Sequence, residues 1–112
     1  MKYLKKYKIF ESIENQFFKT YKETENWLDK MGINYYNINK DLTVDVRDNT
    51  KVGRWEKVEY IPIQFGKIEG NFDCNINKLK NLIGCPHYIS GNFNAHNNLL
   101  DSTIGCPSYV GG

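Results

Sequence analysis

Two neighbouring segments of the chain repeat one another at an offset of 21 residues. The pattern Ile-x-Gly-Asn-Phe stands at 68–72 and again at 89–93, and Ile-Gly-Cys-Pro stands at 83–86 and again at 104–107. A fixed period of this kind means that equivalent side chains of successive units pack on one another in columns. The repeat therefore constrains the fold more strongly than any other feature of the sequence.

Each unit holds a short alternating stretch that is followed by an asparagine and a leucine. The residues at these positions are Phe72, Cys74, Asn77 and Leu79 in the first unit, and Phe93, Ala95, Asn98 and Leu100 in the second. The alternation predicts a strand with Phe72 and Cys74 turned inward, and the Asn77 amide is expected to bind neighbouring backbone groups. Because the period lies in the range of leucine-rich repeats, we predict an α+β chain with a short leucine-rich-repeat-like β-solenoid of about two to three coils.

The first part of the chain is predicted to cover the open start of this solenoid. Residues 1–48 form an N-terminal helical and β-hairpin cap in this interpretation, residues 49–112 form the solenoid, and the whole is a single compact domain. The spacing of apolar residues predicts a helix over 12–22, and Thr24 is expected to cap a second helix that ends at Gly32. Two strands are predicted at 35–38 and 42–46.

The two Gly-Cys-Pro phrases, at 84–86 and 105–107, resemble the repeats of leucine-rich-repeat-like proteins encoded by large tailed bacteriophages. Three segments that lead into the repeats are similar to the usual entry of those proteins: they stand at 27–33, 41–46 and 61–66. The resemblance covers residues 24–112 and implies an architecture more than an activity. The chain departs from the pattern at 49–56, where a tryptophan and two basic residues make the unit before the two clear repeats irregular.

Charge and cysteine content narrow the function classes. Fifteen Lys and Arg against thirteen Asp and Glu give a net charge of +2, too small to indicate direct nucleic-acid binding. No apolar run reaches the roughly 18 residues of a membrane span, and no signal-peptide core follows Met1. An odd number of cysteines without an export signal indicates a reducing compartment, which the phage resemblance makes the host bacterial cytoplasm.

The predicted concave strand face is the first candidate site. Its outward side chains are Asn71, Asp73 and Asn75 in one unit and Asn92, Asn94 and His96 in the next. Amide groups offer both hydrogen-bond donors and acceptors. Two interpretations are open here: a protein-binding surface, or a solvated face with asparagine ladders.

The cysteines and histidines are a weaker candidate for chemistry. Cys85 or Cys106 beside His87 could serve as a nucleophile pair, and the same residues with Cys74 and His96 could suggest zinc. No Cys-x-x-Cys pair is present, and the cysteine spacing follows the repeat, as packing positions do. We therefore predict free core cysteines, no metal, no cofactor and no enzymatic activity.

A lysine-rich start forms a second candidate patch, which consists of Lys2, Lys5, Lys6 and Lys8. The patch could contact nucleic acid or an acidic protein, or it could be a solvated amphipathic start. It also resembles the leaders that send internal proteins into phage heads, in which case the Ile9-Phe10-Glu11 pattern would be cut by a prohead protease.

These observations predict a non-enzymatic protein-binding module. The resemblance implies a phage-encoded inhibitor of a bacterial anti-phage defence effector, for example a CRISPR nuclease complex, with a host protein as partner. The alternatives are a virion or head-internal structural protein, and a nucleic-acid-binding accessory protein that uses the lysine-rich start. The C-terminal solenoid edge is expected to be covered by a second copy, by a partner strand, or by Tyr109 and Val110 themselves.

Overall fold

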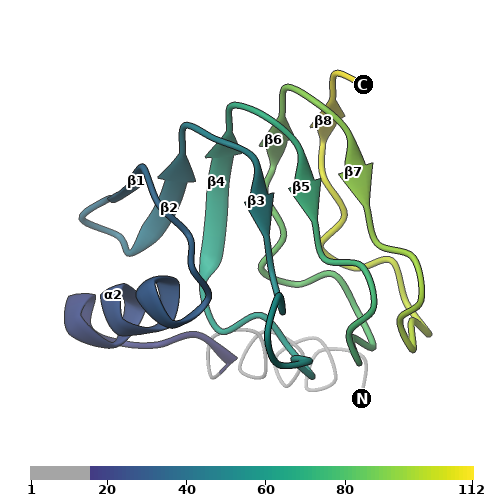
Figure 1. The fold of residues 1–112 in the computed structure, drawn as a ribbon, viewed down its shortest axis with the longest axis horizontal. Helices are drawn as coiled ribbons and strands as arrows, with labels where there is room; N and C mark the ends of the chain where they lie inside the picture. Colours follow the sequence, from purple (N-terminus) through teal and green to yellow (C-terminus); the bar gives the residue numbers. More distant parts are fainter. Residues whose placement is uncertain (1–15) are drawn as a thin grey trace, which may run out of the picture.

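The computed structural model describes residues 16–112, and the chain is drawn in Figure 1. The lysine-rich patch, the proposed leader cleavage pattern and residues 12–15 of the helix predicted over 12–22 lie outside the described residues. No helix within 16–112 has both the length and the apolar character needed to cross a bilayer.

The helix α2 (Tyr21–Lys30) is capped four residues before the predicted cap, Thr24. Thr20 is the N-cap: its Oγ1 accepts a hydrogen bond from the Glu23 backbone N–H at 3.2 Å and donates to the Glu23 carboxylate at 2.8 Å. Thr-x-x-Glu is the sequence pattern of a capping box, although here the Glu23 carboxylate accepts the Thr20 hydroxyl. Thr24 is buried inside the helix and donates its hydroxyl to the Thr20 carbonyl. Residues 17–20 are not helical, so the predicted helix over 12–22 is wrong in its last part.

The larger sheet has five strands in the order β1-β2-β4-β6-β8. Their bounds are Tyr36–Ile38, Thr43–Val46, Gln64–Ile68, Tyr88–Ile89 and Tyr109–Val110. β1 pairs antiparallel with β2, which confirms the predicted hairpin, and the other strands pair in parallel. Asp41 shapes the hairpin turn, because its Oδ1 accepts the Thr43 backbone N–H at 3.0 Å and the Thr43 hydroxyl at 2.7 Å.

The smaller sheet has three parallel strands in the order β3-β5-β7. Their bounds are Thr50–Lys51, Phe72–Asp73 and Phe93–Asn94. The 21-residue period sets the register of the later strands in both sheets, since Phe72 pairs with Phe93 and Tyr88 with Tyr109. Each sequence unit thus supplies one strand to each sheet.

The irregular unit is longer by one residue. Thr50 pairs with Phe72 at an offset of 22, and in the larger sheet Val44 pairs with Phe65 but Val46 with Ile68. The extra residue sits in a bulge, where the Asp45 Oδ1 accepts the Lys67 backbone N–H at 2.8 Å. The departure from the pattern at 49–56 therefore does not remove β3, which pairs with β5 at the offset of 22 that this bulge sets.

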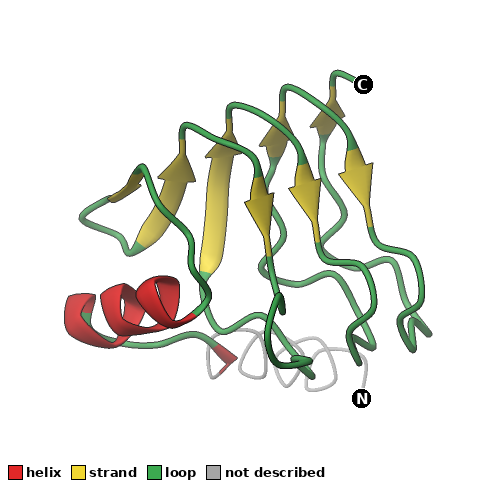
Figure 2. Cartoon of the chain, in the orientation of Figure 1, coloured by secondary structure: helices red, strands yellow, loops and turns green. Residues whose placement is uncertain are grey.

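The core lies between the two sheets, which face each other across it (Figure 2). The Phe65 ring of β4 meets the Phe72 ring of β5 edge-on, with centroids 5.2 Å apart. Trp27 of α2 packs on Phe65 at 6.2 Å, and Leu28 is fully buried. Apolar side chains from both parts of the chain thus form one cluster.

The predicted leucine-rich-repeat-like β-solenoid is wrong. Over residues 16–112 the structure is an α+β fold with α2 and two separate sheets, one mixed and one parallel, in which no solenoid closure is found. The physical reason is that the period fixes only the offset between neighbouring strands. It does not determine whether the two rows of strands close into one coil, and the β1–β2 hairpin, which lies outside the repeat, makes the larger sheet mixed.

Candidate functional site

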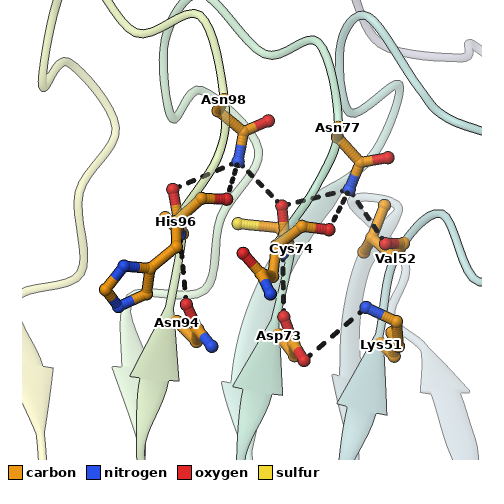
Figure 3. Close-up of polar contacts among 10 residues, drawn as sticks. Lys51, Val52, Asp73, Cys74, Asn77, Asn94, His96 and Asn98 are labelled. Carbon is orange, nitrogen blue, oxygen red and sulfur yellow. Dashed lines mark hydrogen bonds and ion pairs between the residues drawn. The ribbon is translucent and has the colours of Figure 1, made fainter.

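The six residues predicted to form a binding face lie on β5, on β7 and on the turns beside them. Asp73 pairs with Asn94 across the smaller sheet, and both flank residues turned toward the core. Lys51 of β3 joins the same row, with its Nζ 3.6 Å from the Asp73 Oδ2 (Figure 3). We call the six residues together with Lys51 the amide face.

Sequence reasoning missed Lys51 because its offset from Asp73 is 22 rather than 21. The signal was present in Lys51 and Val52, which repeat the polar-then-apolar order of Asp73 and Cys74. Thr50 is polar where Phe72 is apolar, although both are buried. Lys51 and Asp73 offset each other's charge, so the amide face is close to neutral.

Two side chains of the amide face are anchored to the backbone in the same way. The Asp73 Oδ1 accepts the Asn75 backbone N–H at 2.8 Å, and the Asn94 Oδ1 accepts the His96 backbone N–H at 3.1 Å. These Asx turns hold the two side chains in matching orientations. The His96 ring is exposed and extends beyond this row (Figure 3).

A ladder of asparagines runs along the end of the amide face where the strands begin, and Asn71 and Asn92 belong to both. The Asn49 Oδ1 accepts the Asn71 backbone N–H, and the Asn71 Oδ1 accepts the Asn92 backbone N–H, both at 2.8 Å. Asn71 therefore joins successive units, and Asn49 is a member of the ladder that the 21-residue offset did not reveal.

Two further asparagines hold the chain at the other end of the strands. The Asn77 Nδ2 donates to the Val52 and Cys74 carbonyls, each at 3.0 Å, and its Oδ1 accepts the Val58 N–H at 2.9 Å. Asn98 repeats the arrangement one unit later. This confirms the role predicted for the Asn77 amide. Gly53, at φ +81°, makes room for it, because a Cβ there would meet the Asn77 Oδ1.

The cysteines are packed as free thiols. Cys74 and Cys85 are buried, Cys106 is exposed, and none of them forms a disulfide. A hydrogen bond with the Cys74 thiol, together with burial, raises the pKa of Cys85 well above its ordinary value. Its thiolate, the nucleophilic form, is therefore disfavoured, and His87 lies exposed at the surface. Within residues 16–112, no group of three or more His, Cys, Asp or Glu side chains is arranged to hold a metal ion.

We expect one fast-reacting thiol in the folded protein. Ellman's reagent should modify Cys106 within the mixing time of a manual assay, because reactivity follows exposure and thiolate content. Cys74 and Cys85 should react only when urea unfolds the chain. A Cys106→Ser variant provides the control and should lose the fast phase alone. A fast phase of two or three thiols in the native protein would contradict the packing of Cys74 and Cys85.

Comparison of the chain with protein-family models, with curated proteins and with solved structures finds no match. The amide face combines two side chains held by Asx turns with the Lys51–Asp73 ion pair.

Proposed function

We propose that the chain is a non-enzymatic protein-binding module that uses the amide face. The observation that carries this proposal is the double use of Asp73 and Asn94. One oxygen of each side chain is held by the backbone, while the other polar atom is left on the surface: the Asp73 Oδ2 beside Lys51, and the Asn94 Nδ2 without a hydrogen bond in the described part of the chain.

This arrangement favours binding for an entropic reason. Ordering a side chain at an interface costs roughly 0.5–1.5 kcal/mol, and groups already held in place avoid much of that cost. A row of fixed donors and acceptors suits an irregular protein surface with polar backbone and side-chain groups. The near neutrality of Lys51 with Asp73 does not suit a polyanion such as nucleic acid.

The resemblance to repeats of phage-encoded proteins supports a more specific form of the proposal. In this form the chain is an inhibitor that docks on a bacterial anti-phage defence effector, such as a CRISPR nuclease complex, in the cytoplasm of the host. Such an inhibitor needs a stable scaffold and a binding face, and no catalytic group.

A plating assay with a matched pair of variants tests both forms. Expression of the chain in bacteria with an active defence system should restore plaques of a phage that the system blocks. The Asp73→Asn/His96→Ala variant should no longer restore plaques. Its affinity for the effector, measured after the effector is captured on the tagged chain, should fall by about tenfold or more. Asp73→Asn keeps the Oδ1 that accepts the Asn75 N–H, so the variant should melt as the parent does.

The Asp45→Asn/His87→Ala variant is the control. It makes the same two changes on the larger sheet, where the Asp45 Oδ1 likewise accepts a backbone N–H and His87 is likewise exposed. This control should protect the phage fully. Equal effects of the two variants on effector capture would place the binding surface away from the amide face. If expression of the parent chain does not raise the number of plaques, the inhibitor form of the proposal is wrong.

A further inference from the structure

Exposed apolar side chains gather at one end of the molecule. Ten large apolar residues are exposed among the described ones, and five of them lie between residues 99 and 110. These five are Leu99, Leu100, Ile104, Tyr109 and Val110. They lie on β8 and on the connection that joins β7 to β8, and we call this surface the end face.

Both sheets have an unpaired edge at the end face. β8 is the last strand of the larger sheet and β7 the last strand of the smaller one (Figure 1). One unit earlier, the Ile89 carbonyl accepts the Gly111 N–H and the Cys74 N–H donates to the Asn94 carbonyl. The equivalent positions, Val110 and Ala95, have no next strand within residues 16–112. Such edges readily pair with a further strand.

A ladder of side chains crosses the outer face of the larger sheet and reaches this edge. The Lys67 Nζ lies 5.3 Å from the centre of the Tyr88 ring, and the Tyr88 and Tyr109 rings stack with centroids 4.9 Å apart at an angle of 7°. Tyr88 is half-buried in this ladder, whereas Tyr109 is 53% exposed. One ring face of Tyr109 therefore has no neighbour within the described chain.

Charge does not oppose contact between two copies of the end face. Between residues 89 and 112 the only residue among Lys, Arg, Asp and Glu is Asp101. The rest of the surface can therefore approach an identical surface without like-charge repulsion.

We propose that the end face binds a second copy of the chain across a two-fold axis, with Tyr109 stacked on Tyr109 of the copy. The Tyr109 N–H donates to the carbonyl of His87, the residue just before β6, so on its outer side Tyr109 takes a non-hydrogen-bonded position of an antiparallel pair. In such positions the Cα atoms approach to about 4.5 Å and side chains lie close. Four tyrosines would then stack in one row, with a lysine at each end.

A second copy fits the end face better than a single added strand. One strand would cover Tyr109 and Val110 but leave Leu99 and Ile104 in water, because these lie on the connection between the two sheets. The end face of a second copy has the same two layers and the same apolar side chains, so it covers both edges together, as isologous interfaces do.

Sedimentation velocity over a range of concentrations tests this proposal with the purified chain of 112 residues. The parent should shift from monomer to dimer as concentration rises. Tyr109→Lys places like charges opposite each other and should raise the dimer dissociation constant by at least about tenfold, and Leu99→Lys should act similarly. Tyr109→Phe keeps the stacked ring and should dimerise as the parent does.

Tyr21→Lys is the matched control, since Tyr21 on α2 is 54% exposed, nearly the same as Tyr109. It should leave the dimer intact, and circular dichroism should show all four variants folded. If the parent chain stays monomeric at every concentration, the proposal is wrong. This holds also if the monomer binds an added peptide strand. Equal dimerisation of the parent, Tyr109→Lys and Leu99→Lys also overturns it, because the contact then lies elsewhere.

Discussion

Replacement of Phe72 with alanine is expected to lower the free energy of unfolding by about 3–5 kcal/mol. Phe72 is fully buried, and its ring contacts Phe65 of the opposite sheet and Phe93 of the next strand. Its removal leaves a cavity at the point where both sheets meet. Domains of this size have about 5–15 kcal/mol of stability in total, so the melting temperature should fall by roughly 15 °C or more.

Phe93→Ala is the control, because it removes the equivalent aromatic ring one repeat unit later. Phe93 has the same register and stacks on Phe72 with centroids 6.3 Å apart, but it is only half-buried. The loss of stability should therefore be clearly smaller than for Phe72→Ala. Equal losses in thermal melts followed by circular dichroism would show that the two aromatic positions are covered alike, contrary to the burial described above.

The second large effect is expected at Asn77. Asn77→Ala leaves the Val52 carbonyl and the Val58 N–H without their partner in a buried place, at a cost of about 2–4 kcal/mol. The Cys74 carbonyl is spared, because the Asn98 Nδ2 also donates to it at 2.9 Å. Urea unfolding should show the loss as a lower midpoint with an unchanged slope.

Two companion variants separate hydrogen bonding from shape. Asn77→Asp is isosteric and keeps the acceptor for the Val58 N–H, but it sets a carboxylate oxygen against the Val52 and Cys74 carbonyls, so it should destabilise at least as much as alanine. Asn98→Ala removes the equivalent amide at a half-buried site and should cost less. A tolerated Asn77→Asp would mean that the Nδ2 hydrogen bonds contribute little.

The local features of this fold were predictable wherever a residue acts on its own neighbourhood. The β1–β2 hairpin, the inward turn of Phe72 and Cys74, and the amide role of Asn77 all follow from alternation and from side-chain chemistry within a few residues. The start of α2 was not predicted correctly, because Thr20 and Thr24 are both good caps and only Thr20 has Glu23 three residues later to complete the box. The arrangement of two separate sheets depends on how distant strands meet, which a period alone does not encode.

The candidate site shows the same division. The alternation predicted that Asp73 and Asn94 point outward, and the 21-residue period predicted that they lie side by side. The structure adds that both side chains are held by Asx turns. Lys51 and Asn49 escaped notice because one extra residue in the irregular unit moves them out of the 21-residue register. A search that allows one insertion per unit would have brought both residues into line with Asp73 and Asn71.

The spacing of the strands also bears on how the chain finds its fold. Every parallel pairing joins residues 21 or 22 positions apart, so each step of sheet growth closes a loop of about the same modest length. Loop-closure entropy rises only slowly with length, and here it hardly varies from one step to the next. Assembly can therefore advance from the β1–β2 hairpin and α2 one strand at a time, with no single distant contact acting as the slow step.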